Sequence, residues 1–293
     1  MTIELIEDRL REYALLMRLH RPIGIYLLLW ATLWALWLAG AGQPPQGTVL
    51  VFVLGVVLMR SAGCVINDIA DRDFDPHVAR TRDRPLAAGR VTLAEAVALA
   101  VILCLLAFAL VLTQNTLTIQ LSFVGLALAV SYPLMKRVHH FPQFHLGAAF
   151  GWGIPMAYAA ISNTLPPVAW LLFLANVLWA AIYDTEYAMV DREDDLKIGL
   201  KSTAIRFGEW DKRIIGYLQL TLLFLLVGIG LLNGCGGFYY LGLLIAGWLA
   251  LYQQYLIRDR KPDDCFKAFL NNNAFGLAIF CGLLLDFLPK GPA

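Results

Sequence analysis

The sequence predicts an all-α membrane protein that crosses the bilayer nine times. Hydrophobic residues make up 59% of its 293 residues and charged residues only 15%, whereas a soluble domain has about 25% charged residues. Long apolar segments recur along the whole chain, and a backbone in lipid must satisfy its own hydrogen bonds, which favours helices. The net charge of +1 gives no electrostatic reason to expect a nucleic-acid partner. The five cysteines are scattered and form no C-x-x-C pair, which argues against a disulfide framework or a zinc site.

We expect one integral-membrane domain over residues 1–293. Residues 1–21 are charged and amphipathic and lack the apolar region of a signal peptide, which predicts an interfacial helix. Each later apolar segment is close to the length of about 20 residues that a crossing needs. The predicted crossings are 22–41, 47–66, 91–112, 116–135, 141–161, 166–184, 213–232, 237–257 and 268–288.

Lysine and arginine are distributed unevenly between the two sides of the predicted bundle. They gather in the N-terminal segment and in every second loop, and the loops between carry none. Basic loops stay in the cytoplasm, so we expect a cytoplasmic N-terminus. The two longest loops, 67–90 and 185–212, lie on this same side, and long loops in a compact bundle are usually functional. We therefore expect the functional site at the cytoplasmic ends of the helices.

The second predicted crossing runs into an acidic motif. Asn67, Asp71 and Asp75 follow one another at four-residue intervals, and Asp68 is three residues before Asp71. If the helix continues through them, these side chains share one face. Arg60 is seven residues before Asn67, which is close to two helical turns, so its side chain should point in nearly the same direction from a position deeper in the bilayer. An arginine within a membrane helix is a functional candidate by default.

The sixth crossing leads into a second acidic motif. Asp184, Asp191 and Asp195 are spaced at i, i+7 and i+11, which again places them on one helix face. Asp191 lies 120 residues after Asp71, and Asp195 lies 120 residues after Asp75. The repeated D-x-x-x-D pattern on one side of the membrane suggests a parallel internal duplication.

Both motifs predict a site for metal ions and phosphate. Carboxylates crowded at the mouth of a bundle repel one another, and Mg²⁺ is a suitable counter-charge because it binds carboxylate and phosphate oxygens. The candidate ligands are Asn67, Asp68, Asp71, Asp75, Asp184, Asp191 and Asp195. Basic residues nearby could bind the remaining phosphate oxygens: Arg72, Arg80, Arg82, Arg84, Lys136, Arg137, Lys197 and Lys201. The alternative is a structural acidic patch that pairs with these same residues.

Together these motifs resemble the signatures of the UbiA family of intramembrane prenyltransferases. The matching segments are Asn67-Asp-x-x-Asp71-x-x-x-Asp75 with Arg84-Pro85-Leu86, and Tyr183-Asp184-Thr-x-Tyr187-Ala-Met-x-Asp191-x-x-Asp194-Asp195. The resemblance covers nearly the whole chain. It implies nine helices around a central cavity open toward lipid, in a bacterial inner membrane with the active site facing the cytoplasm. It also implies Mg²⁺-dependent transfer of a polyprenyl group from its diphosphate to 4-hydroxybenzoate, ortho to the hydroxyl, in ubiquinone biosynthesis.

This reaction suggests roles for particular residues. Asp191 is a candidate base for the phenol or, equally, only a metal ligand. Arg60 and Arg137 are candidates for the acceptor's carboxylate, and the alternative for both is a structural arginine that reaches toward the interface. Aromatic side chains could stabilise an allylic cation or could simply pack in the bundle. The aromatic candidates are Tyr132, Tyr183, Tyr187 and Trp179.

Three questions stay open at the level of the sequence. The same chemistry could act on another aromatic acceptor: a dihydroxynaphthoate, a homogentisate, a haem precursor or a chlorophyll precursor. A cation-coupled transporter is an alternative of another class, although acidic groups at helix ends and a parallel repeat argue against it. Finally, residues 271–273 are three consecutive asparagines in the last crossing, which either bond between helices or line a cavity.

Overall fold

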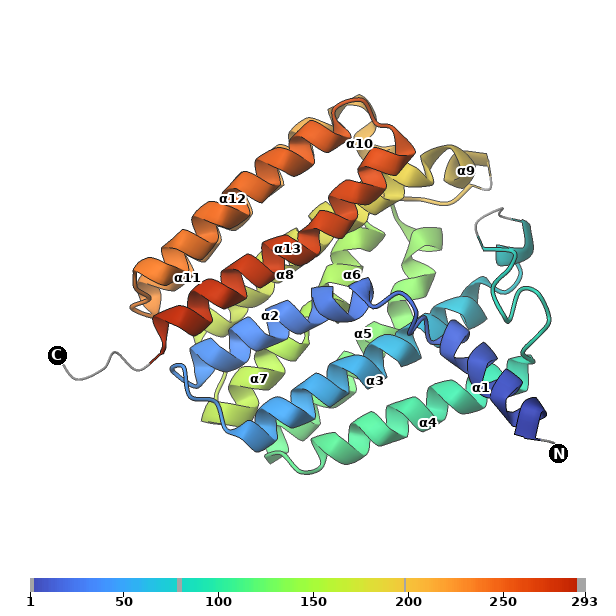
Figure 1. Ribbon diagram of the computed structural model, residues 1–293, viewed down its shortest axis with the longest axis horizontal. Helices are drawn as coiled ribbons and strands as arrows, with labels where there is room; N and C mark the ends of the chain where they lie inside the picture. Colours follow the sequence, from blue (N-terminus) through green and yellow to red (C-terminus); the bar gives the residue numbers. More distant parts are fainter. Residues whose placement is uncertain (1–2, 78–80, 198, 289–293) are drawn as a thin grey trace.

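All regular elements are helices in the computed structural model, which describes residues 3–77, 81–197 and 199–288 (Figure 1). The elements are α1 (Ile3–Leu16), α2 (Ile23–Ala39), α3 (Gln46–Asp71), η1 (Asp75–His77), α4 (Leu93–Val111), α5 (Thr116–Val138), α6 (Pro142–Gly151), α7 (Gly153–Ser162), α8 (Pro167–Val190), α9 (Arg192–Lys197), α10 (Thr203–Phe207), η2 (Gly208–Trp210), α11 (Asp211–Leu232), α12 (Gly237–Ile257) and α13 (Pro262–Asp286).

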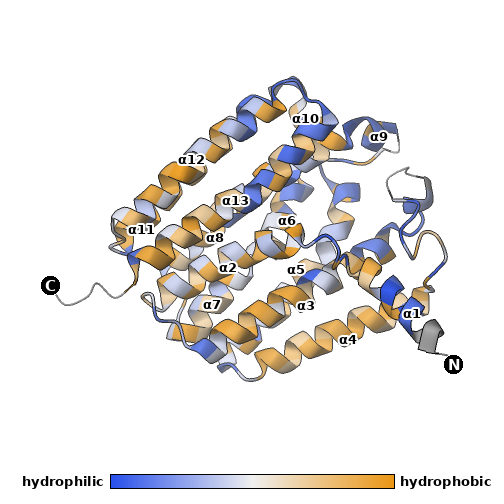
Figure 2. Cartoon of the chain, viewed as in Figure 1, coloured by the Kyte–Doolittle hydropathy of each residue, from blue (hydrophilic) through white to orange (hydrophobic). Residues whose placement is uncertain are grey.

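The prediction of an all-helical membrane protein is confirmed. Each of the nine predicted ranges contains helix, and seven helical stretches of the described chain are long and apolar enough to cross a membrane. The remaining two ranges, 22–41 and 141–161, hold shorter helices: α2 has 17 residues, and α6 and α7 have 10 residues each. Apolar residues run along the long helices, whereas hydrophilic residues gather where α1, α9 and α10 lie (Figure 2).

The predicted crossing over 141–161 is divided into two helices rather than one. α6 ends at Gly151 and α7 begins at Gly153, with Trp152 between them. Pro155 has no N–H to donate to the carbonyl of Gly151, four residues earlier, so the helical ladder is interrupted there. The Trp152 Nε1 donates instead to the carbonyl of Leu121 in α5, at 2.8 Å. The break is therefore held by a contact to the neighbouring helix.

Both acidic motifs begin on helices rather than in loops. α3 continues to Asp71 and α8 continues to Val190, so the segments 67–90 and 185–212 start with helical residues. Helix-forming side chains continue past the apolar stretch of α8, and most residues over 185–190 are buried against neighbouring elements. The predicted continuous helix faces are wrong beyond these ends. Asp75 lies in η1, Asp191 is the C-cap residue of α8, and Asp195 lies in α9, because the chain leaves the helical path after Asp71 and Val190. We call the end of the bundle where α3 and α8 finish the motif end.

The three consecutive asparagines join α13 to three different helices. Asn271 accepts a hydrogen bond from a glutamine of α12 at 3.1 Å. Asn272 accepts from Trp179 of α8 at 2.9 Å, and Asn273 accepts from Trp30 of α2 at 2.8 Å. Successive residues of a helix point about 100° apart, so three neighbours in sequence reach three neighbours in space. These asparagines therefore bond between helices, which answers the question that the sequence left open.

Candidate functional site

A cavity of about 520 Å³ opens at the motif end and brings the two acidic motifs together. It is lined by residues of α1, α2, α3, α5, α6, α8 and α13 and of the segments that follow α1, α3 and α8. Residues 120 positions apart in sequence thus face one space. The sequence-predicted charged and polar site residues that line it are Arg60, Asn67, Asp68, Asp71, Asp75, Arg84, Lys136, Asp184, Tyr187, Asp191, Asp195 and Lys201.

Four of the predicted phosphate-binding residues do not line the cavity: Arg72, Arg82, Arg137 and Lys197. Arg72, Arg82 and Lys197 have side chains that are 49%, 65% and 70% exposed, and each pairs with a nearby aspartate. Spacing along a sequence does not fix the direction of a long side chain beyond the end of a helix, which explains the difference. Arg80 falls outside the described residues.

Arg137 binds the outside of the first motif instead of facing the cavity. Its Nη2 donates to the carbonyl of Ala70 and lies 3.4 Å from Oδ1 of Asp71. Its guanidinium carbon is 4.8 Å from the centre of the Phe74 ring. These contacts fix Arg137 against the end of α3, and the structure does not place it where an acceptor in the cavity could reach it.

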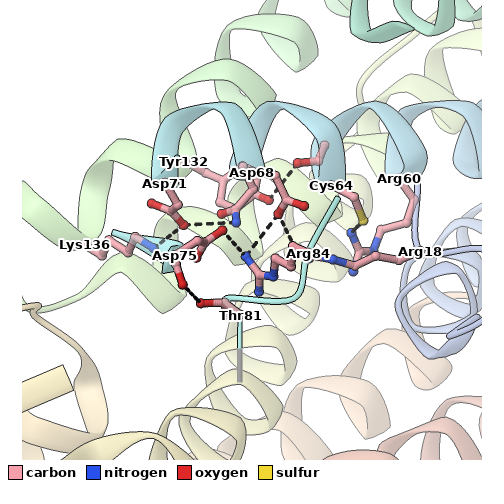
Figure 3. Close-up of polar contacts among 12 residues, drawn as sticks. Arg18, Arg60, Cys64, Asp68, Asp71, Asp75, Thr81, Arg84, Tyr132 and Lys136 are labelled. Carbon is pink, nitrogen blue, oxygen red and sulfur yellow. Dashed lines mark hydrogen bonds and ion pairs between the residues drawn. The ribbon is translucent and has the colours of Figure 1, made fainter. Parts of the chain in front are cut away.

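Asp71 is the centre of one polar group in the first motif (Figure 3). Lys136 Nζ donates to its Oδ2 at 2.5 Å, and Asn67 Nδ2 donates to the same oxygen at 3.1 Å. Asp71 is only 2% exposed. A carboxylate buried to this degree needs a cation or hydrogen-bond donors, and here it has both.

Asp68 and Asp75 form a second polar group around Arg84 (Figure 3). Arg84 Nη1 lies 3.1 Å from Oδ1 of Asp68 and 2.8 Å from Oδ2 of Asp75. Arg18 donates to the same oxygen of Asp68. Arg18 lines the cavity, although no separate role was predicted for it from the sequence. The available signal was an arginine close to the predicted membrane surface, but its partner is 50 residues away in sequence.

The second motif lines the same cavity as the first, together with aromatic side chains of α8 and α13. Asp184 and Tyr187 belong to α8, and Asp191 caps the end of that helix. The Tyr187 ring lies 4.9 Å from the Phe269 ring of α13, centre to centre. Tyr132 and Tyr183 also line the cavity, whereas Trp179 does not.

Trp179 is a core residue rather than a cavity residue. Its ring stacks on Trp34 with centres 5.0 Å apart, and its Nε1 is bound to Asn272. Of the four aromatic candidates, it is the one for which packing is the observed role.

Arg60 lies where the polar cavity meets a second, apolar cavity of about 340 Å³. The apolar cavity is lined by residues of α2, α3, α4, α5, α6 and α7 and by Trp152, and it shares Arg60, Tyr132 and Phe150 with the polar cavity. Arg60 donates to the sulfur of Cys64, and its buried Nε has no hydrogen-bond partner among the described residues. Among those residues Arg60 also forms no ion pair. Its guanidinium therefore has unused donors beside both cavities.

The donor chemistry of the polar cavity fits Mg²⁺. Six aspartates of the two motifs and Asn67 line it, and oxygen ligands of this kind are those that Mg²⁺ takes. Within the described chain, however, no three His, Cys, Asp or Glu side chains converge closely enough to hold an ion. In the structure, Arg18, Arg84 and Lys136 form ion pairs with carboxylates of the first motif.

The fold and the site define an integral membrane protein with a charged cavity at one end of a helical bundle and an apolar cavity beside it. The model of the UbiA prenyltransferase family matches residues 28–279, and the chain belongs to this family. It is 62% identical over 286 residues to a protein of Alkalilimnicola ehrlichii named 4-hydroxybenzoate octaprenyltransferase, with 98% of each chain covered. A second relative of the same name, from Nitrosococcus oceani, is 62% identical over 283 residues, which cover 97% of this chain and 99% of the relative.

Solved structures have the same fold. The apo structure of a UbiA homolog from Aeropyrum pernix K1 has a TM-score of 0.80 and 27% identity, covering 90% of this chain and 98% of that one. A UbiA homolog from Archaeoglobus fulgidus bound to GPP and Mg²⁺ has a TM-score of 0.67 and 18% identity, covering 92% and 99%.

Proposed function

We propose that the protein transfers a polyprenyl group from polyprenyl diphosphate to the ring of 4-hydroxybenzoate, ortho to the hydroxyl, as a step of ubiquinone biosynthesis. One observation carries the proposal: a charged cavity lined by both acidic motifs meets an apolar cavity at Arg60, Tyr132 and Phe150. A prenyl diphosphate has one charged end and one apolar chain, which match these two spaces. The relatives named 4-hydroxybenzoate octaprenyltransferase support this acceptor over other aromatic acids.

The diphosphate is proposed to bind in the charged cavity. Bound Mg²⁺ would stabilise the charge on the leaving diphosphate, and the homolog from A. fulgidus bound to GPP and Mg²⁺ supports this cofactor. The residues proposed to hold the metal are Asn67, Asp71, Asp75, Asp184, Asp191 and Asp195. Lys136 and Lys201 are the cavity lysines that can then bind phosphate oxygens. Arg72 and Lys197 point to solvent and receive no role.

The prenyl chain is proposed to lie in the apolar cavity. Its first carbon would then sit near Tyr132, where the two cavities meet. An allylic cation must be kept from water, and aromatic faces stabilise positive charge. Tyr183 and Tyr187 on the opposite side of the charged cavity complete this aromatic surrounding.

Arg60 is proposed to bind the carboxylate of the acceptor. It has unused donors and forms no salt bridge among the described residues, whereas Arg137 is already bound to Asp71 and to the main chain. We propose that Asp191, which lines the cavity at the end of α8, accepts the proton of the phenol as a general base. An electron-rich phenolate ring is the better nucleophile. An Asp191→Asn enzyme that turns over normally with Mg²⁺ present would contradict this role.

We also propose nine crossings in one domain over residues 1–293, with an interfacial segment 1–21 and the motif end on the cytoplasmic side of a bacterial inner membrane. The seven long apolar helices, the shorter α2 and the pair α6–α7 support this number. The uneven distribution of lysine and arginine supports the orientation. Labelling of single cysteines in loops with an impermeant thiol reagent tests both.

The central experiment measures prenyl transfer in membranes that contain this protein. A polyprenyl diphosphate is incubated separately with 4-hydroxybenzoate, a dihydroxynaphthoate and homogentisate, each with Mg²⁺ or with EDTA. We expect prenylated 4-hydroxybenzoate in the samples with Mg²⁺ and none in the samples with EDTA. The Asp71→Ala variant should form no product. Product with only another acceptor would overturn the substrate. No product from folded protein would overturn the reaction and lead to ion-flux assays of a transporter.

A further inference from the structure

Asp68 differs from the other acidic residues of the first motif in what it contacts (Figure 3). It is 2% exposed, and one of its oxygens accepts hydrogen bonds from two arginines. Arg18 comes from the segment between α1 and α2, and Arg84 comes from the segment between η1 and α4. A single carboxylate thus joins the N-terminal segment and the loop after the first motif to the end of α3.

Asp68 is poorly suited to bind a metal ion in this arrangement. A cation that took its place beside Asp68 would displace both arginines. Arg84 would keep its pair with Asp75, but Arg18, whose side chain is only 24% exposed, pairs with no other carboxylate among the described residues and would be left without a partner, which is costly. Asp71, by contrast, is paired with Lys136, whose flexible stem can turn away, and with Arg137, which also has the carbonyl of Ala70 as a partner.

The two arginines are well placed to bind an anion while they keep Asp68. A guanidinium has five N–H donors, so binding Asp68 on one edge leaves donors on another edge. Arg18 and Arg84 both line the charged cavity. Fixed guanidinium groups recognise phosphate oxygens through paired, charge-assisted hydrogen bonds.

The backbone of Arg18 indicates that its position is held by these contacts. Its φ of +56° lies in the left-handed region, which a side chain with a Cβ rarely adopts. Its hydrogen bond to Asp68 compensates the unfavourable backbone.

We propose that Asp68 is a positioning residue rather than a metal ligand: it holds Arg18 and Arg84 at the cavity for the diphosphate of the donor. Arg18 thereby makes the N-terminal segment a part of the donor site. This inference rests on the proposed function, since it assumes a diphosphate in the charged cavity.

Metal binding, measured apart from turnover, separates the two roles of Asp68. Purified full-length protein in lipid nanodiscs is titrated with Mn²⁺ in the presence of geranyl thiodiphosphate, an unreactive analogue, and free Mn²⁺ is followed by electron paramagnetic resonance. We expect Asp68→Asn to bind as many Mn²⁺ ions as the wild type, with less than about a threefold change in affinity. Asp71→Asn should lose at least one ion. Loss of an ion in Asp68→Asn would overturn the proposal.

A double-mutant cycle tests the link to the donor. We expect Arg18→Gln and Asp68→Asn each to raise the KM for polyprenyl diphosphate about tenfold, with the KM for 4-hydroxybenzoate unchanged. The double variant should be no worse than either single one, because the two residues act as one unit. Independent effects that multiply, or an Arg18→Gln enzyme with normal KM, would refute the link.

Two further measurements keep the outcome clear. Arg9→Gln is the matched control, because Arg9 also belongs to the N-terminal region but pairs with Glu95 at 3.4 Å and does not line the cavity. It should leave both KM values unchanged. If Asp68→Asn does not fold, Arg84→Gln should show the same raised donor KM with a normal Mn²⁺ count. If the wild type forms no prenylated product, the proposed function fails, while the Mn²⁺ count still decides whether Asp68 is a ligand.

Discussion

Gly24 of α2 leaves the space that the guanidinium of Arg60 occupies. A Cβ at this position would lie 2.2 Å from Nε and 2.7 Å from Cζ of Arg60. Carbon atoms in good contact are about 3.5–4.0 Å apart, so Gly24→Ala forces a displacement of roughly 1 Å or more. The guanidinium is the far end of a flexible side chain, and we expect it to move while the helices stay in place.

The size of the effect follows from the interaction that is lost. A hydrogen bond to a charged group contributes about 1.5–3 kcal/mol, and about 1.4 kcal/mol corresponds to a factor of ten. If Arg60 binds the acceptor's carboxylate, Gly24→Ala should raise the KM for 4-hydroxybenzoate by roughly 10- to 100-fold. The KM for polyprenyl diphosphate should stay unchanged, because its charged end is bound by other residues.

Initial rates in nanodiscs, with each substrate varied in turn, measure both constants. Gly228→Ala is the control, because no heavy atom lies within 4 Å of a Cβ built at that position of α11. Both variants should keep the thermal midpoint of the wild type. A folded Gly24→Ala enzyme with normal KM for 4-hydroxybenzoate would refute the role of Arg60. An equal rise for both substrates would show general damage to the site.

Three further predictions concern groups that hold the site in place. Glu186 is fully buried and accepts a hydrogen bond from Asn272 at 2.8 Å, so Glu186→Gln should keep activity and thermal stability, whereas Glu186→Leu should lower stability by about 1–3 kcal/mol in denaturation assays. Asp211 is fully buried and pairs with an arginine of α9 and another between α12 and α13; Asp211→Asn should destabilise the protein by about 1–3 kcal/mol, and an unchanged midpoint would contradict this. A Cβ on Gly282 would lie 2.7 Å from a carbonyl of α12, so Gly282→Ala should lower the thermal midpoint by an amount equivalent to about 1–3 kcal/mol, whereas Gly237→Ala, with open space around it, should not.

The sequence was sufficient for those features that depend on local periodicity. The lengths of the apolar segments predicted the long helices, because each long helix corresponds to one continuous apolar stretch of the sequence. The intervals between Asn67, Asp71 and Asp75 predicted one helix face, but α3 ends at Asp71, so that only Asn67 and Asp71 share the face. Asp75 lines the same cavity from η1. The equal separation of the two motifs indicated one shared site, and Asp191 does face the same cavity as Asp71.

Features that depend on distant contacts were not predicted. The break at Trp152 had local signals in Gly151, Gly153 and Pro155, but its stability comes from a bond to Leu121 in another helix. The direction of Arg72, which faces solvent, could not be distinguished by spacing from that of Arg84, which faces the cavity. Nor does any pattern relate residues 18 and 68, since two chain segments must first be folded against each other.

The ion pairs in the charged cavity follow from the crowding of its carboxylates. Several buried carboxylates cannot lie together without cations, because repulsion and desolvation would destabilise the charged forms. Arg84 and Lys136 supply this positive charge in the structure. In the proposed function, the carboxylates would hold the metal and the basic side chains would bind the phosphate oxygens of the donor. One set of residues would then serve both the internal ion pairs and the proposed binding of the donor. Arg60 forms no salt bridge among the described residues, and its unbonded Nε supports the proposed role in binding the second substrate.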